Sequence, residues 1–306
     1  MTRCKPKGMA FGMRSWPNWT CKRMARLGKN GAAYKKNERA GWNSFAKRYT
    51  KVALPEFRPY GKRLVELATV RKGLWVLDVA TGPGEPALTV ARKVGRSGFV
   101  LGVDFSATML GIARARAKRS GARNVQFRRM DAERLTLQDM TFDRVLSRFG
   151  LMLMPDAERA LSEMYRVLVP GGIIAVAVWS SQQKVNTMGI VRKVLAKHDA
   201  FVPSADAPDF FRFGKAGALE RALRGAGFRH VRSERMSVEW VFDGPEDFWT
   251  SMKQGPCMKR ALAKISPTVR RAVQTDVIQA VTRFERRGKL RIPNEAILAV
   301  ATRFSP

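Results

Sequence analysis

The stretch Val76-Leu77-Asp78-Val79-Ala80-Thr81-Gly82-Pro83-Gly84 leads from an apolar run into a glycine turn. A helical pattern begins at Ala87, so the fingerprint Gly82-x-Gly84-x-x-Ala87 stands between a predicted strand and a predicted helix. Glycines at these positions permit a tight turn and a close approach of ligand to backbone, and the helix N-terminus faces the ligand. The stretch therefore predicts a cofactor loop of the nucleotide-binding kind.

Strand-like and helix-like segments alternate on either side of this loop. Predicted strands cover residues 74–80, 99–104, 125–130, 142–147 and 173–179, and predicted helices cover residues 87–94, 107–120 and 157–168. Regular alternation of this kind favours a parallel sheet with helices on both faces. We therefore expect an α/β fold, Rossmann-like and doubly wound, with a mostly parallel seven-stranded sheet and helical cap segments.

The remaining segments define the expected domain organisation. Residues 41–72 are predicted to be helical, with a break at Pro55 and Pro59. Beyond the core the pattern predicts helices at 186–198, 216–226 and through most of 245–284, and strands at 230–242 and 296–304. We expect one domain over residues 41–306, with its core at 73–180 and cap segments at about 181–215 and 245–290. A helical cap over a cofactor site suits a small or lipid-like acceptor.

The charge is strongly basic. The chain holds 57 Lys and Arg against 25 Asp and Glu, a formal net charge of +32. Such a surface attracts nucleic acid or another anionic surface, or it reflects a trait of the source proteome. Residues 1–40 contain one acid, Glu38, and are predicted to be a basic flexible extension. Trp16 and Trp19 are candidates for stacking on bases there; a disordered tail, a targeting segment or a start codon placed too early are the alternatives.

Cysteine and histidine usage narrows the chemistry. Cys4, Cys21 and Cys257 lie far apart and form no CxxC pair, which predicts a reducing, cytoplasmic location and neither a disulfide framework nor a metal site. His198 and His230 are the only two histidines in the sequence, so catalysis that needs several histidines is disfavoured. No apolar run approaches the ~20 residues of a membrane span. The oligomeric state stays open.

Three acids distinguish between possible cofactors. Asp78 stands four residues before Gly82, where a carboxylate suits a cationic ligand and would repel a pyrophosphate, which speaks against an NAD(P)-dependent oxidoreductase. Asp104 ends the next strand, where an acid accepts ribose hydroxyls or caps the following helix. Asp131 closes the third strand and is available to an adenine amino group.

These features, taken in order, resemble the motifs of class I S-adenosylmethionine-dependent methyltransferases over about residues 41–180. The motifs are the cofactor loop, Gly102-Val-Asp-Phe-Ser106, Asp131-Ala132, Phe142-Asp-Arg-Val145 and Arg166-Val-Leu-Val-Pro-Gly-Gly172. The resemblance implies S-adenosylmethionine as cofactor, with its methionine end at the loop, its ribose at Asp104 and its adenine at Asp131. The cofactor site it implies comprises Asp78, Ala80, Thr81, Gly82, Gly84, Asp104, Phe105, Met109, Asp131, Ala132 and Ser147.

Within that superfamily the chain is most similar to the broad group related to ubiquinone and menaquinone biosynthesis methyltransferases (methyltransferase type 11). Ala40-Gly-Trp-Asn-Ser-Phe-Ala-Lys-Arg-Tyr49 and Ser147-Arg-Phe-Gly-Leu-Met152 carry this likeness. The chain departs from the quinone enzymes proper, because it lacks their Tyr-Asp opening and their Glu after the fifth strand. These departures speak against a quinone precursor.

The acceptor site is less well defined by sequence. The candidates are Trp42, Tyr49, Arg148 and Phe149. The aromatic residues would line an apolar pocket or serve as ordinary core, and Arg148 would orient an acidic or carbonyl-bearing acceptor. No residue stands out as a general base, so the catalytic residue is open, and alignment of the reactants would supply much of the catalysis.

The functional prediction is C- or O-methylation of a small molecule by direct in-line transfer. The alternative is an RNA or protein methyltransferase, or a nucleic-acid-associated assembly factor, that uses the basic surface. Against base methylation, Ser147-Arg148-Phe149-Gly150 follows the fourth strand in place of an Asn/Asp-Pro-Pro-aromatic motif.

Overall fold

The computed structural model describes residues 21–200 and 207–304, with side chains from residue 31 onward, Cys257 excepted. The predictions for residues 1–20, including those for Trp16 and Trp19, lie outside this range. So does the stretch 201–206 of the first cap segment.

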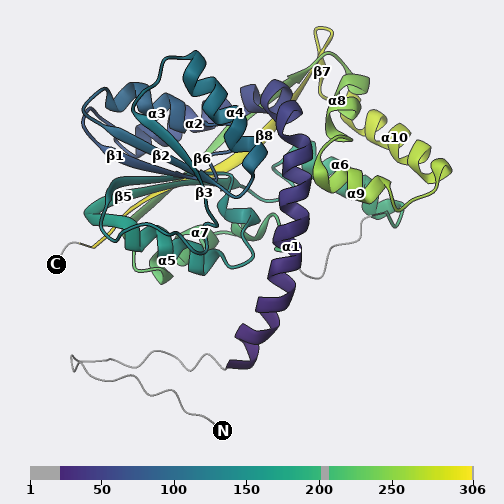
Figure 1. The fold of residues 1–306 in the computed structure, drawn as a ribbon. Coiled ribbons are helices and arrows are strands. Elements are labelled where there is room, and N and C mark those ends of the chain that lie inside the picture. The colour runs from purple at the N-terminus through teal and green to yellow at the C-terminus, as the bar shows by residue number, and fades with distance from the viewer. Residues whose placement is uncertain (1–20, 201–206, 305–306) are drawn as a thin grey trace.

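A single mixed sheet organises the molecule (Figure 1). Its order is β3-β2-β1-β4-β5-β8-β6, with the short β7 paired to β8. Strands β1 to β5 pair in parallel, and β8 runs antiparallel to both of its long neighbours. The strands are β1 (Trp75–Val79), β2 (Phe99–Asp104), β3 (Val125–Arg129), β4 (Phe142–Arg148), β5 (Leu168–Trp179), β6 (Arg229–Phe242), β7 (Glu285–Arg286) and β8 (Lys289–Thr302). The expected α/β, mostly parallel sheet is confirmed.

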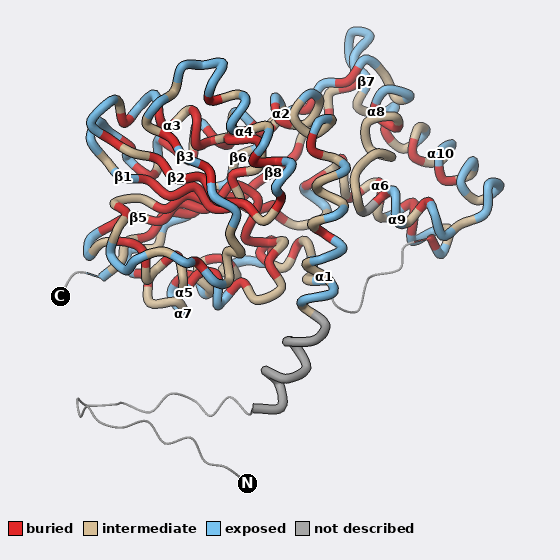
Figure 2. The backbone as a smooth tube through the Cα atoms, in the orientation of Figure 1, coloured by how far each residue is buried: buried red, intermediate tan, exposed pale blue. Residues whose placement is uncertain are grey.

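Helices cover both faces of this sheet, as Figure 1 shows. One face carries α2 (Leu54–Leu67), α3 (Ala87–Val94) and α4 (Ala107–Arg119), and the other carries α5 (Ala157–Val167) and α7 (Ala218–Gly225). The central strands are buried between the two layers (Figure 2), and residues 174–179 of β5 are all buried. That burial on both faces explains the nearly continuous apolar sequence of this strand.

Further helices gather at one end of the sheet and form a cap (Figure 1). They are α6 (Asn186–Lys197), α8 (Pro245–Met252), α9 (Pro256–Leu262) and α10 (Pro267–Thr282). The short helical turns η2 (Leu151–Leu153) and η3 (Arg212–Gly214) lie between the larger elements.

Helix α1 (Cys21–Arg48) departs from the sequence prediction. The boundary expected at residue 40 falls inside this helix, since residues 21–40 are helical in the structure. Glu38 is buried and pairs with Arg260 of α9 at 2.6 Å, which fixes α1 against the cap. A long-range contact of this kind leaves no trace in local sequence periodicity, which is why the helix was missed.

The expected break at Pro55 and Pro59 is also absent. The π-helical turn η1 (Tyr49–Ala53) joins α1 directly to α2. Pro55 lies in the first turn of α2, where its missing N–H costs nothing, and Pro59 lies inside the helix without ending it. The buried face of α2, which includes Phe57 and Tyr60, holds the helix against the sheet and outweighs the cost of the internal proline.

Strand β8 begins seven residues earlier than the predicted start at residue 296. Residues 290–294 alternate buried and partly buried, and they pair with the second half of β6. Arg287 and Gly288 both have positive φ and form the turn between β7 and β8. The resulting β6–β8 ribbon extends from the core sheet to the cap.

Asn294 connects this ribbon to the cap. Its buried side-chain oxygen accepts hydrogen bonds from the Thr187 backbone N–H at 3.0 Å and from the Thr187 hydroxyl at 2.8 Å. Its amide nitrogen donates to the Ile292 carbonyl at 3.1 Å, and the Tyr60 hydroxyl donates to the Asn294 carbonyl at 2.6 Å. The start of α6, the ribbon and α2 therefore meet at one buried polar residue.

Replacing Asn294 with Ala is expected to lower the free energy of unfolding by about 2–3 kcal/mol, because the Thr187 groups are left buried without a partner. Urea denaturation measures the change, and Gln274→Ala, an exposed amide on α10, is the control. A loss no larger than that of the control would show that α6 does not depend on this contact.

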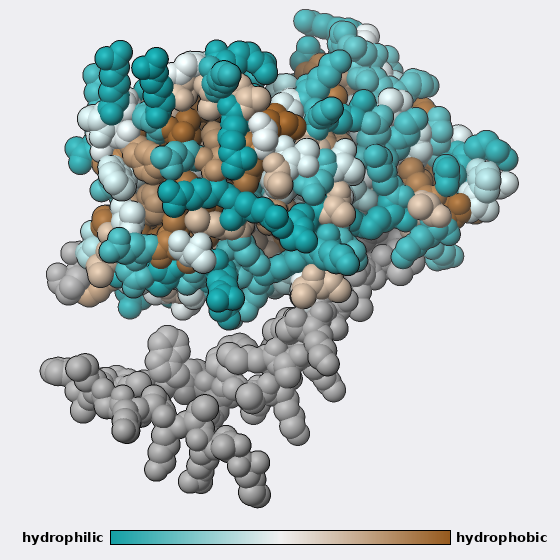
Figure 3. Space-filling model, viewed as in Figure 1, coloured by the Kyte–Doolittle hydropathy of each residue, from teal (hydrophilic) through white to brown (hydrophobic). Residues whose placement is uncertain are grey.

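The hydrophilic character of the surface agrees with the large number of charged residues in the sequence. Most of the face shown in Figure 3 is hydrophilic, in keeping with the net charge of +32. Among the helices described, none has the length and apolar character needed to cross a membrane.

Candidate functional site

The carboxyl ends of β1, β2 and β4 meet at one edge of the sheet. Asp78 of β1 is aligned with Gly102 of β2 on one side and Leu146 of β4 on the other. The chain then leaves β1 through a turn in which Ala80 (φ 59°), Gly82 (φ 56°) and Gly84 (φ 89°) all have positive φ. This left-handed backbone explains the two glycines of the fingerprint.

Asp78 is fully buried at the base of this turn. Its Oδ2 accepts hydrogen bonds from the Thr81 hydroxyl at 2.6 Å and from the Ala87 N–H at 3.0 Å. Its Oδ1 is buried with no hydrogen-bond partner among the described residues. Burial raises the pKa of Asp78 to about 7. The loop thus presents one carboxylate oxygen that has no hydrogen-bond partner among the described residues.

Asp104 lies beside the turn at the end of β2. Its Oδ2 accepts from the Gly82 N–H and its Oδ1 from the Ser106 N–H, both at 2.9 Å. The cap of α4 is Ser106, whose hydroxyl accepts from the Met109 N–H at 3.1 Å, so capping does not account for Asp104. Burial raises the pKa of Asp104 to about 6. Each carboxylate oxygen keeps lone pairs for a further donor.

Ser147 approaches the turn from β4. Its Oγ is buried and, within the described part of the chain, has no partner. A Cβ on Gly150 would lie 2.5 Å from the Ala80 Cβ and 3.0 Å from the Ser147 Oγ, so the absence of a side chain at Gly150 lets these segments approach each other. The predicted site residues from β1 and β4 therefore lie together.

Helix α1 contributes polar groups that the sequence prediction missed. Lys35 donates to Asp131 at 2.7 Å and also pairs with Glu133. The Ser106 hydroxyl donates to the Asn43 side-chain oxygen at 2.6 Å. These contacts hold α1 against the loops after β2 and β3, which carry the predicted ribose and adenine residues. Ala132 is partly buried against the core, and Phe105 precedes Ser106 in the same loop as Asp104.

Aromatic side chains gather next to the loop and form what we call the aromatic cluster. It comprises Trp42, Phe45, Tyr49, Phe57, Tyr60, Phe149, Trp179 and Trp240. Three of its members, Trp42, Tyr49 and Phe149, are predicted acceptor residues. Trp42 and Tyr49 are 5.8 Å apart between ring centroids. Phe57 joins the two halves, since it contacts Tyr49 at 5.7 Å and Phe149 at 5.0 Å.

The two histidines lie elsewhere in the structure. His198 follows α6 and its Nε2 is 2.9 Å from Asp276 of α10, and His230 is exposed on β6. Within the described residues neither histidine has a hydrogen bond to the cofactor loop, and no base is assigned.

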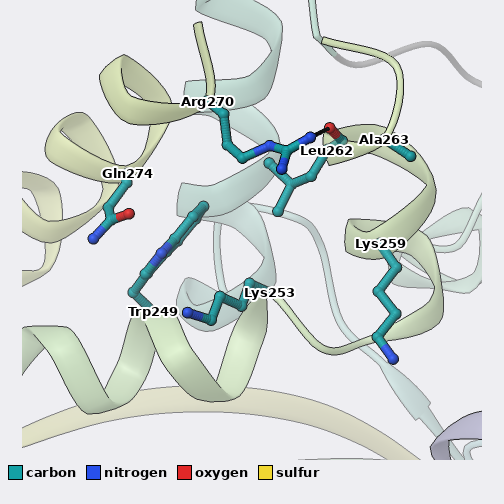
Figure 4. A pocket seen from close by; sticks show the side chains of 7 residues that line it. All are labelled: Trp249, Lys253, Lys259, Leu262, Ala263, Arg270 and Gln274. Carbon is teal, nitrogen blue, oxygen red and sulfur yellow. Dashed lines mark hydrogen bonds between the residues drawn. The ribbon is translucent and has the colours of Figure 1, made fainter. Parts of the chain in front are cut away.

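The cap carries an open hollow of about 380 Å³, lined by side chains from α8, α9 and α10 (Figure 4). Its lining residues are Trp249, Lys253, Lys259, Leu262, Ala263, Arg270 and Gln274. None of them belongs to the predicted cofactor site or the aromatic cluster. The hollow is therefore a separate feature of the cap.

The unpartnered groups at the loop fit the amino-acid end of S-adenosylmethionine. Asp78 Oδ1 and Ser147 Oγ are hydrogen-bond acceptors at the ends of neighbouring strands. An ammonium group offers three donors and a positive charge, which would satisfy both acceptors and compensate the buried carboxylate. A pyrophosphate would leave Asp78 without compensation and add repulsion.

Comparison with known proteins identifies relatives with these motifs. Residues 42–239 match the ubiE/COQ5 methyltransferase family. A demethylmenaquinone methyltransferase of Staphylococcus aureus is 32% identical over 195 residues, which cover 59% of this chain and 78% of that protein. One of Listeria welshimeri is 40% identical over 114 residues, which cover 37% of this chain and 48% of that protein. The chain thus spans about half the length of the Listeria relative.

Solved structures share the fold. A Bacillus halodurans protein described as a candidate methyltransferase superposes with a TM-score of 0.56 at 22% identity, covering 80% of this chain and 99% of that one. The YcgJ protein of Bacillus subtilis gives a TM-score of 0.55 at 17% identity, with 80% and 98% covered. At these identities the likeness concerns the fold alone. The match over residues 42–239, more than half of the sequence, places the chain in the ubiE/COQ5 methyltransferase family.

Proposed function

We propose that this protein transfers a methyl group from S-adenosylmethionine to a carbon or oxygen of an apolar small molecule. The observation that carries the proposal is the pair of unpartnered acceptors, Asp78 Oδ1 and Ser147 Oγ, at the cofactor loop. The bound cofactor supplies an activated methyl group on a sulfonium. The family match and the demethylmenaquinone methyltransferase relatives support the same activity.

We assign each end of the cofactor to residues in this arrangement. Asp78 and Ser147 bind the amino group, and the backbone of the Gly82–Gly84 turn allows close approach. Asp104 accepts from the ribose hydroxyls while it holds the Gly82 and Ser106 N–H groups. Asp131, oriented by Lys35, accepts from the adenine amino group.

The aromatic cluster supports an apolar, ring-bearing acceptor. Its buried faces offer dispersion contacts and exclude water from the reacting atoms. The relatives' name makes a demethylated quinone one candidate, while the missing Tyr-Asp and Glu signatures of the quinone enzymes favour a different ring. Positioning of acceptor and donor in line supplies the catalysis in this scheme, and an acidic acceptor needs no general base.

Thermal unfolding tests the proposal. S-adenosylmethionine and S-adenosylhomocysteine should each raise the melting temperature, and NADH should not. Asp104→Ala should lose most of the rise in melting temperature. The substitution removes the carboxylate that we assign to the ribose and also the acceptor of the Gly82 N–H hydrogen bond. Asp243→Ala, at an exposed acid far from the loop in sequence, is the control. The absence of a shift in the wild-type protein would contradict the proposed activity.

Methyl transfer to acceptors is then measured directly with radiolabelled cofactor. A panel of demethylated quinols, phenols and aliphatic lipids distinguishes the acceptor classes, and product analysis distinguishes C- from O-methylation. Transfer to RNA or protein in place of these molecules would support the alternative based on the net charge of +32. The cysteine pattern supports a cytoplasmic location for the reaction.

A further inference from the structure

The hollow between α8, α9 and α10, which we call the cap hollow, lies in a strongly basic part of the chain. Residues 248–275 contain six Lys and Arg and no Asp or Glu. Three of these cations, Lys253, Lys259 and Arg270, line the hollow, and Figure 4 shows that they come from three different helices or their ends. Its described lining residues include no acid. The cap hollow is therefore a concave surface with one sign of charge.

The charges in the cap hollow are not compensated within the described part of the chain. The ammonium groups of Lys253 and Lys259 have neither an ion pair nor a hydrogen bond there. Arg270 donates through Nη2 to the Leu262 carbonyl at 2.7 Å, which holds the guanidinium in place and leaves its other N–H groups for a further acceptor. Like charges gathered in a concave surface repel one another and attract anions. A bound anion would relieve this repulsion.

Helix polarity explains two of these cations and not the third. Lys253 follows the last turn of α8 and Lys259 lies in the last turn of α9, where the helix dipole stabilises a positive charge. Arg270 is instead the fourth residue of α10, near the end where the dipole favours an acid, and the first turn of that helix contains no acid. The position of Arg270 is thus unfavourable for its own helix and suits an anionic ligand.

The cap hollow also has an apolar wall. Trp249 and Leu262 line it beside the cations, and both are largely buried in the cap. Apolar surface next to a few converging polar groups is typical of sites for organic molecules. A phosphate monoester matches the cations best, because it carries close to two negative charges near neutral pH and three terminal oxygens. A carboxylate has one charge and two oxygens to share among three cations.

We propose that the cap hollow binds the phosphate group of an organic molecule. Lys253, Lys259 and Arg270 contact the phosphate oxygens, and Trp249 and Leu262 contact the remainder of the molecule. The site is separate from the cofactor loop and from the aromatic cluster, so it does not depend on the proposed methyl transfer. A soluble phosphate ester and the headgroup of phosphatidic acid both offer this chemistry, and binding measurements separate these two sources.

Phenyl phosphate and benzoate form a pair of probes that share the ring and differ in the anion. Both are titrated by calorimetry against the full chain at pH 7.5. The wild-type protein should bind phenyl phosphate at least about tenfold more tightly than benzoate, because the phosphate offers a further charge-assisted hydrogen bond. Inorganic phosphate should bind more weakly than phenyl phosphate, since it has no ring to contact the apolar wall.

Lys253→Met and Arg270→Met should each weaken the binding of phenyl phosphate at least about tenfold, because each loses one charged donor. Lys264→Met is the matched control, because Lys264 is exposed in the same basic segment and does not line the hollow. Its affinity should stay within about twofold of the wild-type value, since salt screens a distant exposed charge. The Lys253 side chain makes no hydrogen bond in the described chain, so Lys253→Met should keep the melting temperature of the ligand-free protein.

Vesicles of neutral lipid with and without phosphatidic acid identify the source of the phosphate. Binding to the phosphatidic acid vesicles that Lys253→Met abolishes and phenyl phosphate displaces would assign the site to a lipid headgroup. Binding of phenyl phosphate without binding of the vesicles would assign it to a soluble phosphate ester.

Three results would overturn the inference. The first is the absence of phenyl phosphate binding by the wild-type protein. The second is equal affinity for phenyl phosphate and benzoate. The third is a loss of affinity in Lys264→Met as large as that in Lys253→Met, which would mean that the basic segment attracts anions through its overall charge and not through the cap hollow.

Discussion

Asp78→Asn is expected to weaken the binding of S-adenosylmethionine at least about 30-fold. The variant keeps the shape of the side chain and an oxygen that accepts from Thr81 and Ala87. It removes the negative charge, which we assign to the amino group of the cofactor. Losing one partner of a buried charge pair typically costs about 2–5 kcal/mol of binding energy. Isothermal titration calorimetry at pH 7.5 measures the loss.

A second ligand separates the charge effect from damage to the loop. 5′-Methylthioadenosine carries the adenine and ribose of the cofactor without the amino-acid end, so Asp78→Asn should bind it as the wild type does. Asp243→Asn, at an exposed acid paired with Lys289, should behave as wild type with both ligands. Equal losses for both ligands in Asp78→Asn would contradict the assignment of Asp78 to the amino group.

The cofactor loop could be predicted from sequence because its determinants are local. Asp78, Gly82 and Gly84 lie within seven residues, and positive φ at both glycines is what the pattern requires. The alternation of the core strands and helices is local too, and the sheet confirms it. The roles given to the individual site residues remain predictions.

Features that depend on distant contacts were missed. Helix α1 has a weak apolar stripe, and its position depends on the Glu38–Arg260 and Lys35–Asp131 pairs. Phe57 and Trp240 were not singled out from the sequence, yet their ring centroids lie 5.1 Å apart within the aromatic cluster. Such contacts join residues far apart in the chain, and no spacing rule encodes them.

The affinity for S-adenosylmethionine is expected to fall as the pH drops below about 7. Burial raises the pKa of Asp78 to about 7 in the ligand-free protein, and the amino group pairs with the ionised form. Binding therefore requires the loss of a proton at lower pH, which costs about tenfold in affinity for each pH unit. Burial raises the pKa of Asp104 to about 6, so the fall should steepen below that value. Calorimetry between pH 5.5 and 7.5 measures the profile.

Stability should change in the opposite direction. Both folded-state pKa values lie above those of the unfolded chain, so these two acids destabilise the ligand-free fold as the pH rises from about 4 to 7. Acidification thus raises the stability of the ligand-free protein and lowers its affinity for S-adenosylmethionine. The rise in melting temperature that S-adenosylmethionine causes should therefore become smaller as the pH falls. 5′-Methylthioadenosine should show only the step near pH 6, because it has no amino group for Asp78. If the carboxylates of Asp78 and Asp104 hold the cofactor, their titration between pH 5.5 and 7.5 must change the affinity for S-adenosylmethionine. An affinity that stays constant over this range would therefore contradict their assignment to the cofactor.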